Sequence, residues 1–240
     1  MTAKDYSKVK NQLGAKPAKW AKYVKHNAPK KRNFGFGVTR CELCGTTRGH
    51  MSQYGLNICR RCFRLNAKNL GFKIRMHADE IKPIGGAGLA AELGAISADH
   101  LGAASEEDLM KMAKKGVIAT LLPCTIFSLG MESYAKARFM IDNGGAVALA
   151  TDYNPGSCNC ANMQMAMTLA NIKMKMTIEE AITASTINAA YALEMGDVTG
   201  SIEAGKKADI IIMNTKNYQY IPYHFGSNNV KTVIKDGKII

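Results

Sequence analysis

Four cysteines arranged in two pairs constrain the fold of this chain more than any other feature. Cys41 and Cys44 form one C-x-x-C pair, and Cys59 and Cys62 form a second pair after fourteen intervening residues. Two thiolates from one C-x-x-C turn can take adjacent corners of a tetrahedron, and a second pair completes it. Because four sulfurs leave no coordination position open, the spacing predicts a closed structural zinc site.

The residues around the cysteines predict a small zinc-binding module. Gly45 follows the first pair, where the turn often needs a backbone without Cβ. A helix is expected over Cys59–Leu70 and is expected to end at Gly71. The basic residues of this helix, which are expected to form one face over the metal, are Arg60, Arg61, Arg64 and Lys68.

Two other interpretations of the four cysteines stay open. A rubredoxin-like iron site uses the same four sulfurs for electron transfer, although its sequence is rarely this cationic. A DNA-binding zinc finger requires a clear recognition helix. We favour structural zinc and RNA binding. The spacing also suits a metal site more than a disulfide framework, which favours a reducing, cytoplasmic compartment.

Charge is distributed unevenly along the 240 residues. Residues 1–76 contain 18 Lys and Arg and only two acids, a surplus of 16 positive charges. Residues 77–240 contain 14 Lys and Arg and 17 acids, a surplus of three negative charges. This asymmetry predicts an N-terminal part that binds a polyanion and a C-terminal part with another task. No run of 18 apolar residues occurs, so no membrane span is expected.

Residues 1–40 form a basic arm that has few aliphatic residues. Because a core needs clustered aliphatic side chains, we expect the arm to be extended or to fold only on binding. Its Lys and Arg can neutralise phosphates, and its aromatic residues can stack on unpaired bases. The alternative is a solvated basic tail. The residues predicted to bind RNA, in the arm and the zinc module, are Lys30, Lys31, Arg32, Arg40, Arg48, Arg60, Arg61, Arg64 and Lys68.

Residues 33–73 resemble the zinc-bearing small-subunit ribosomal protein of the fourteenth universal family, in its archaeal and eukaryotic form. The matching elements are an F-G-x-G approach, the cysteine spacing, Tyr54–Asn57, Cys59–Arg64 and Leu70–Phe72. The resemblance implies a structural role in translation, with binding to 16S-type rRNA and to proteins of the small ribosomal subunit.

After residue 72 the sequence alternates between short apolar runs and Ala- and Met-rich segments of helical length. The expected strands are Phe72–Met76, Ala95–Leu101, Val117–Leu122 and Ala146–Thr151. The expected helices are Gly86–Leu93, Glu106–Lys115 and Met131–Asn143. Repeats of this kind predict βαβ units and a parallel sheet.

Polar residues follow three of the expected strands. His77, His100 and Asp152 each come at the C-terminal end of a different strand, and Glu80 lies three residues beyond His77. In a (β/α)8 barrel these strand ends converge on one mouth. Imidazole and carboxylate groups are ligands of Zn²⁺ or Fe²⁺, which can activate a bound water. A single histidine at a strand end is also compatible with an ordinary polar position.

Residues 72–240 resemble imidazolonepropionases, the cyclic-amide hydrolases of histidine degradation in the metal-dependent amidohydrolase group. The motifs that carry the resemblance are His77–Glu80, Ser97–Leu101, Leu121–Pro123, Ala148–Ser157, Thr186–Leu193, Gly200–Asp209 and Pro222–Gly226. The resemblance implies hydrolysis of 4-imidazolone-5-propanoate to N-formimidoyl-L-glutamate. It also implies a small β-sandwich, to which Gly200–Asn214 and Val230–Ile240 contribute strands.

The same resemblance implies roles for individual residues. His77 and Asp152 are implied as ligands of a catalytic zinc or iron ion. Glu80, His100 and Asp152 are implied as the catalytic residues that act on the substrate and transfer protons. The residues implied for substrate binding are Glu80, Asn154, Gly156 and Ser157.

The chain departs from the imidazolonepropionase pattern in its metal ligands. In that family the first barrel strand carries an H-x-H pair that supplies two ligands, and no H-x-H occurs in this sequence. The segment corresponds to about strands five to eight of the barrel. We therefore expect an incomplete metal site, no imidazolonepropionase activity from this chain alone, and self-association through open strand edges.

The expected fold class is mixed. A small four-Cys zinc module with a basic extended arm precedes an α/β partial (β/α)8 barrel and remnant β-sandwich strands. The expected domains are an RNA-binding arm (1–40), a zinc-ribbon-like ribosomal module (41–73), the C-terminal half of an amidohydrolase barrel (74–199) and part of a small β-sandwich (200–240).

Three interpretations of the whole chain stay open. The first is a ribosomal RNA-binding protein with a non-catalytic tail. The second is a metal-dependent hydrolase with a basic appendage, and the third is a product of two merged reading frames.

Two smaller sequence features have simple interpretations. Cys158 and Cys160 are expected to be inert thiols rather than metal ligands, and the methionines of residues 163–176 are expected to pack in the core.

Overall fold

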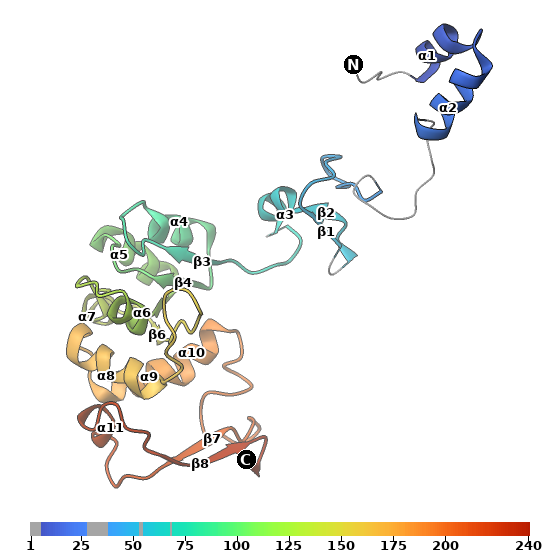
Figure 1. The fold of residues 1–240 in the computed structure, drawn as a ribbon. Helices are drawn as coiled ribbons and strands as arrows, with labels where there is room; N and C mark the ends of the chain where they lie inside the picture. Colours follow the sequence, from blue (N-terminus) through green and yellow to red (C-terminus); the bar gives the residue numbers. More distant parts are fainter. Residues whose placement is uncertain (1–5, 28–37, 53–54, 68) are drawn as a thin grey trace. The chain divides into compact units, whose positions relative to one another are not determined.

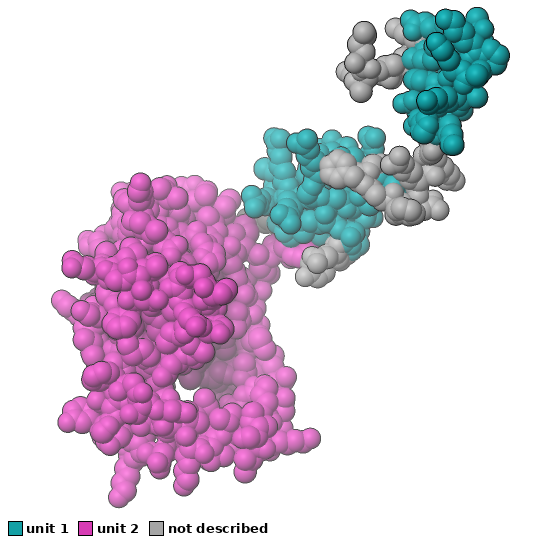
Figure 2. Space-filling view, in the orientation of Figure 1, with its two compact units in different colours: residues 1–70 teal, residues 71–240 magenta. Residues whose placement is uncertain are grey.

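The computed structural model describes residues 6–27, 38–52, 55–67 and 69–240. The chain divides into two compact units, residues 1–70 and residues 71–240 (Figure 1, Figure 2). Four of the residues predicted to bind RNA lie outside the described residues: Lys30, Lys31, Arg32 and Lys68. No helix in the described part of the chain is long and apolar enough to cross a membrane.

The basic arm contains two helices, α1 (Tyr6–Leu13) and α2 (Pro17–Asn27). The expectation of an extended arm is therefore wrong for these residues. Pro17 suits the first position of α2 because its φ is already helical, and the Ala and Lys residues that follow are good helix formers. No residue of α2 is buried, although the rings of Trp20 and Tyr23 stack with centroids 5.8 Å apart. Local propensity and contact with the neighbouring α1, rather than a buried core, account for this helix.

The four-cysteine module is built from a short hairpin and one helix. Strands β1 (His50–Met51) and β2 (Ile58–Cys59) pair antiparallel, and α3 (Arg60–Asn66) follows directly. The expected helix was too long at its C-terminal end, since α3 ends before residue 67 and Gly71 lies beyond it with φ +80°. Leu65, in the last turn of α3, is 71% exposed, so it adds no packing that would extend the helix.

Residues 71–240 contain the predicted parallel sheet. Its four strands are, in spatial order, β3 (Arg75–Ala78), β4 (Ser97–His100), β5 (Ile118–Leu121) and β6 (Val147–Leu149). The registers place His77 opposite Asp99, and Asp99 opposite Thr120. The first strand begins three residues later than expected. Residues 72–74 are extended chain that leads into it, although the Ile74 carbonyl already accepts a hydrogen bond from Ile96.

Two helices that connect the strands have the expected bounds. They are α4 (Gly86–Leu93) and α5 (Glu106–Lys115). The side chain of Ser105 caps the start of α5, and Gly94 and Gly116 end the two helices in the left-handed conformation that glycine adopts readily.

The single helix expected over Met131–Asn143 is wrong. Two shorter helices, α6 (Pro123–Ser128) and α7 (Ala137–Asp142), lie on either side of a segment without regular structure. Pro123 takes the first position of α6, and Gly130 has φ +65° just beyond the end of that helix. The residues after Gly130 therefore begin a loop instead of a helix.

Three further helices complete the α/β part: α8 (Met163–Met174), α9 (Ile178–Ser185) and α10 (Ile187–Ala192). The core joins the strands to the inner faces of the helices. Its largest fully buried apolar side chains are Leu101, Leu109, Met112, Leu121, Met140 and Met176. The interpretation of the methionines as core is confirmed for Met174 and Met176, whereas Met163 and Met167 are half-buried at its margin.

A small antiparallel sheet ends the chain. Its order is β7 (Ile210–Met213), β8 (Val230–Lys235) and β9 (Lys238–Ile239), and the short helix α11 (Tyr220–Tyr223) lies between the first two strands in sequence. Strands were expected in these regions, but residues 200–209 contain none. Ile211 and Ile239 are 58% and 76% exposed, so this sheet leaves apolar side chains uncovered.

Candidate metal centre and strand-end site

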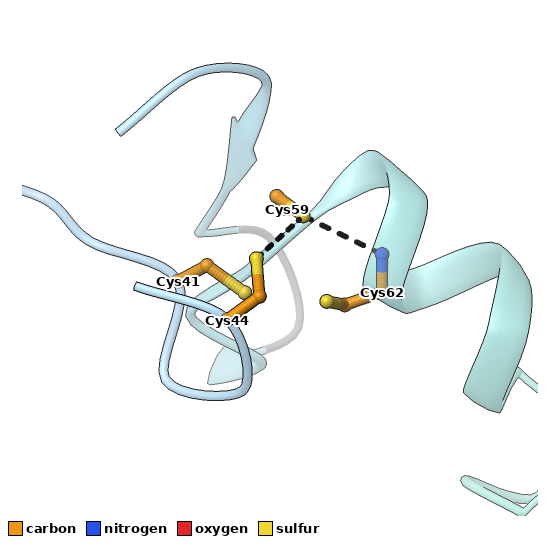
Figure 3. A group of neighbouring side chains, drawn as sticks. All are labelled: Cys41, Cys44, Cys59 and Cys62. Atoms are coloured by element: carbon orange, nitrogen blue, oxygen red, sulfur yellow. Dashed lines mark hydrogen bonds between the residues drawn. The ribbon is translucent and has the colours of Figure 1, made fainter. Parts of the chain in front are cut away.

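The four cysteines of the first unit form a compact cluster of sulfurs. Their ligand atoms all lie within 4.8 Å of one another, and the side chains point toward a common centre (Figure 3). The sulfurs of Cys44 and Cys59 are 3.6 Å apart, and the backbone N–H of Cys62 donates to the sulfur of Cys59. The structure therefore brings together the four predicted zinc ligands.

Local backbone geometry explains why these sulfurs converge. The N–H of Cys41 donates to the carbonyl of Thr46 at 2.8 Å, and the N–H of Gly45 donates to the carbonyl of Cys41 at 2.8 Å. Gly45 has φ +70°, which confirms the expectation that this turn needs a residue without Cβ. The second pair of sulfurs is set by α3, because Cys59 is its N-cap and Cys62 lies in its first turn.

The electrostatics of the cluster suit a cation. Burial alone raises the pKa of Cys41, but the backbone amides of Cys59, Cys44 and Leu43 outweigh it and lower the value to about 6. The side chain of Cys44, burial, and the thiols of Cys59 and Cys41 raise the pKa of Cys62 to about 12. The backbone N–H of Cys62 likewise lowers the pKa of Cys59, so thiolates are favoured at Cys41 and Cys59 while further thiolates repel them. A divalent cation at the centre removes that repulsion, so the four residues fit a tetrahedral zinc ion.

Basic side chains surround the cluster. The described residues predicted to bind RNA are all exposed: Arg40, Arg48, Arg60, Arg61 and Arg64. Three of them lie on α3, whose buried residue Cys62 faces the sulfurs. The helix therefore presents its arginines to solvent while it holds one pair of cysteines.

In the second unit, two histidines meet at the C-terminal ends of neighbouring strands. His100 Nε2 lies 2.9 Å from His77 Nδ1, and the two rings are 5.0 Å apart. Glu80 Oε1 lies 3.6 Å from His100 Nδ1. The side chain of His100 is only 4% exposed, whereas that of His77 is open to solvent. The structure thus joins three of the residues predicted for the catalytic site.

Asp152 belongs to the same region of the sheet. A cavity of about 340 Å³ is lined by His77, Asp99 and Asp152, together with further residues of the four parallel strands and of α10. The hydroxyl of the buried Thr125 donates to Asp152 Oδ2 at 2.7 Å. Asp152 has φ +55°, an uncommon backbone conformation for this residue type.

The loop after Asp152 is held by its own side chains. Asn154 Oδ1 accepts hydrogen bonds from the backbone N–H groups of Gly156 and Ser157 at 2.9 and 2.7 Å. Asn154 Nδ2 donates to the carbonyl of Asp152 and to the hydroxyl of Ser157. The polar atoms predicted to bind a substrate carboxylate are therefore already engaged with one another.

The sequence interpretation missed three residues that shape this site. Asp79 is buried and accepts hydrogen bonds from the N–H groups of Ile84, Gly86 and Ala87, which fixes the loop that carries Glu80. Asp99 lies 3.9 Å from His77 Nε2, and burial raises its pKa. Thr125 is the third. Two of these residues could have been predicted from the sequence, because Asp79 lies two residues after His77 and Asp99 directly precedes His100.

The predicted catalytic metal does not fit these residues as they stand. His77 Nδ1 faces His100, and one oxygen of Asp152 faces Thr125. Within the described ranges the four module cysteines are the one group of three or more His, Cys, Asp or Glu side chains close enough to hold an ion. His77 and Asp152 share a cavity without forming a metal-binding set.

Comparison with known proteins agrees with the two-part organisation of the chain. The model of the amidohydrolase family matches residues 62–240, which include the sheet, the strand-end site and the small antiparallel sheet. The chain belongs to the amidohydrolase family. The model of the ribosomal protein S14p/S29e family matches residues 25–73, which include the four cysteines. Both resemblances inferred from sequence are confirmed, and their succession along one chain is consistent with a fusion.

Curated relatives specify the amidohydrolase part further. Imidazolonepropionases of Bacillus mycoides (strain KBAB4) and Bacillus cereus (strain B4264) are each 53% identical over 177 residues. The match covers 74% of this chain and 42% of each relative. The chain thus spans about two fifths of the length of the curated relatives it matches.

Solved structures show the same fold at lower identity. An adenosine deaminase from Xanthomonas campestris with bound zinc superimposes with a TM-score of 0.62 at 22% identity, over 73% of this chain and 47% of that one. E. coli guanine deaminase gives a TM-score of 0.58 at 17% identity, over 74% and 49%. These likenesses support an amidohydrolase-type fold for the α/β part.

Proposed function

We propose that the N-terminal part of this chain is an rRNA-binding structural component of the small ribosomal subunit, and that the amidohydrolase part is inactive on its own. The observation that carries the proposal is the four-sulfur cluster, whose ligand atoms lie within 4.8 Å of one another beside the exposed arginines of α3. The zinc-dependent module is complete within this chain, whereas the strand-end site is not.

The proposed RNA-binding surface has a clear physical basis. A zinc ion held by the four cysteines would join β2, α3 and the first cysteine turn, and so would fix the positions of the arginines of α3. Arginine binds phosphate through paired hydrogen bonds, and each neutralised phosphate releases counterions. The stacked Trp20 and Tyr23 of α2 lie between Lys19, Lys22 and Lys25, which suits unpaired bases flanked by phosphates. The proposed partners are 16S-type rRNA and proteins of the small subunit, in the cytoplasm.

The proposed domains keep the boundaries expected from sequence. They are the basic arm (1–40), the zinc-ribbon-like module (41–73), the C-terminal half of the barrel (74–199, about strands five to eight) and part of the small β-sandwich (200–240). The four parallel strands and the position of His77, His100 and Asp152 at their C-terminal ends support the barrel assignment.

The amidohydrolase part carries the residues of an imidazolonepropionase site without a complete metal set. We propose that Glu80, His100 and Asp152 descend from catalytic residues, and that Asn154, Gly156 and Ser157 descend from the residues that held 4-imidazolone-5-propanoate. No H-x-H occurs in this chain, and a zinc or iron ion at His77 and Asp152 would have only two protein ligands. Two ligands hold such an ion weakly, so turnover is not expected.

The experiment is RNA binding by the full zinc-loaded chain. A fluorescent fragment of small-subunit rRNA is titrated and followed by anisotropy, with a DNA duplex of equal length as the control. We expect preference for the RNA, a steep loss of affinity with salt, and a further loss when a chelator removes zinc. Equal affinity for the RNA and the DNA, or an affinity for the RNA that is unchanged after the chelator removes zinc, would contradict the proposal.

Two alternatives have their own tests. A functional hydrolase with a basic appendage is favoured by the shared cavity of His77 and Asp152, and predicts ring opening of 4-imidazolone-5-propanoate after addition of zinc or ferrous iron. A merged reading frame predicts that an independent clone sequenced across codons 70–80 does not read through. Turnover by the purified chain would establish the first alternative and refute the proposed inactivity.

A further inference from the structure

Three cysteines outside the zinc module lie together beside the Asp152 loop. Cys124 belongs to α6, and Cys158 and Cys160 belong to the loop between β6 and α8. Cys124 and Cys158 are buried in one apolar cluster against α8, and Cys160 packs on its edge and is partly exposed. In the described part of the chain these three thiols do not form a metal-binding group. Because the three thiols lie close together, two of them can instead form a covalent bond with each other.

The contacts of each thiol decide which pair can react. The thiol of Cys158 donates to the carbonyl of Thr151 at 3.2 Å, which engages it with the backbone of its own loop. Burial raises the pKa of Cys124 to about 12, and Cys160 packs against the apolar cluster in which Cys124 is buried. Cys124 is therefore a buried thiol, and of the two other thiols in the cluster only Cys160 is not held by a hydrogen bond to a backbone carbonyl of its own loop. Cys160 is also the thiol that solvent reaches.

We propose that Cys124 and Cys160 form a reversible disulfide when the chain meets a peroxide. The Cys160 thiol loses its proton to solvent, the thiolate attacks one peroxide oxygen, the O–O bond breaks, and the hydroxide that leaves takes up that proton to become water. The resulting sulfenic acid is attacked by the sulfur of Cys124, whose proton goes to the departing oxygen. One S–S bond forms, two thiols are oxidised, and one hydrogen peroxide is reduced to two waters.

This bond would fasten the Asp152 loop to α6. Cys124 adjoins Thr125, which donates to the Asp152 carboxylate, and Cys160 lies at the other end of the loop that Asn154 organises. A link between these points closes the loop over the start of α6. The proposal does not depend on RNA binding or on hydrolysis, because it concerns the thiols themselves.

The test uses the full zinc-loaded chain, treated with hydrogen peroxide and then with a thiol-blocking maleimide. Trypsin without a reductant releases Gly116–Lys136, which contains Cys124, and Phe139–Lys173, which contains Cys158 and Cys160. We expect the two peptides joined, with the mass of their sum less two hydrogens plus one maleimide on the cysteine that stays free, and separated again by a reductant. Amide exchange of residues 155–162 should slow several-fold in the oxidised chain.

Matched serine variants identify the partner. Cys158→Ser is expected to keep the joined peptides, and Cys160→Ser is expected to abolish them without affecting folding, since that side chain is partly exposed. Persistence of the link in Cys160→Ser would assign Cys158 instead and overturn the proposal. Absence of any link in the wild-type chain, at peroxide concentrations that oxidise its methionines, would overturn it as well.

Discussion

Thr125 donates a 2.7 Å hydrogen bond to the carboxylate of Asp152, from a position that is fully buried. Asp152 follows β6 with φ +55°, a conformation that costs energy in a residue other than glycine. The bond therefore fixes a strained backbone at the C-terminal edge of the parallel sheet. The bond joins α6 to the loop that carries Asn154 and Ser157. It therefore helps to position the strand-end site, although Thr125 was not among the residues predicted for that site.

The first prediction concerns this bond. Thr125→Val keeps the shape of the side chain but leaves the Asp152 carboxylate without its buried donor. We expect the free energy of unfolding to fall by about 1–2 kcal/mol. Urea unfolding followed by circular dichroism measures it. Thr183→Val, at an exposed threonine of α9, is the matched control and should change stability by less than about 0.5 kcal/mol. Equal effects of the two substitutions would refute this role of Thr125.

The second prediction concerns zinc. Cys62→Ser replaces one thiolate with a hydroxyl that binds zinc poorly, and Cys62 is a buried residue of α3. We expect one zinc per wild-type chain in a colorimetric assay after denaturation, and none retained by the variant after dialysis against a weak chelator. Cys160→Ser should retain one zinc. A second zinc in the wild-type chain would show that His77 and Asp152 bind metal after all.

Sequence reasoning succeeded where short-range rules and local partners decide the structure. The bounds of α4 and α5 follow from local caps: the side chain of Ser105 begins α5, and Gly94 and Gly116 end the two helices in the left-handed conformation. The cysteine spacing likewise sets the sulfur cluster, because its ligands lie within two short turns. The expected C-terminal ends of the four parallel strands lie within one or two residues of the observed ends.

The sequence-based predictions failed where an element forms without a buried core, or where a contact joins residues that are far apart in the sequence. The helix over Pro17–Asn27 was missed because the scarcity of aliphatic residues was taken to exclude structure, although its residues favour a helix and it contacts α1. The bond from Thr125 to Asp152 spans 27 residues, and no local pattern marks it. His77 and His100 were expected to lie at the same mouth of the barrel, but their direct contact was not predicted.

The third prediction concerns pH and Glu180. Both oxygens of this carboxylate accept from Arg138 at 2.9 Å, and one also accepts from the N–H of Thr177 at 2.7 Å. The Arg138 hydrogen bonds chiefly lower the pKa of Glu180 below its usual 4.5. The ionised form therefore stabilises the fold fully above pH 4.5, and this contribution is lost as pH falls through the lowered value.

Glu180→Gln should accordingly reduce the free energy of unfolding by about 1–2 kcal/mol at neutral pH. The difference from the wild type should shrink steadily below pH 4.5, because protonated Glu180 no longer differs in charge from glutamine. Glu107→Gln, at an exposed residue of α5 paired with Lys111, is the control with little effect at any pH. A difference that stays constant down to pH 3 would contradict the argument.

The fourth prediction concerns the arginines of α3. Replacement of Arg60, Arg61 and Arg64 by glutamine removes three exposed charges without touching the sulfurs. If each contacts one phosphate, the slope of log affinity against log salt should fall by about 0.7 to 0.9 per arginine. Zinc content should stay at one per chain. As the control, glutamine at Lys231, Lys235 and Lys238 removes three charges from the small sheet and should leave the slope unchanged.

The fifth prediction concerns the open edge of the parallel sheet. Ile74 and Ala78 accept hydrogen bonds from Ile96 and Leu101, so every second residue of β3 points its backbone toward β4. Arg75 and His77, which alternate with them, direct their N–H and C=O groups away from the sheet. At the other edge, Asn188 already donates to the carbonyl of Val147. The β3 edge is thus the more available of the two for pairing with a second copy.

Proline tests this edge selectively. Arg75→Pro removes an N–H that points away from β4, so the fold should persist while pairing between copies is blocked. Met76→Pro removes an N–H that faces β4, and should destabilise the sheet by about 3 kcal/mol or more. Sedimentation velocity should show concentration-dependent association of the wild-type chain, little of it in Arg75→Pro, and full association in Arg75→Ala, which separates charge from backbone. Equal association of Arg75→Pro and the wild type would show that copies do not meet at β3.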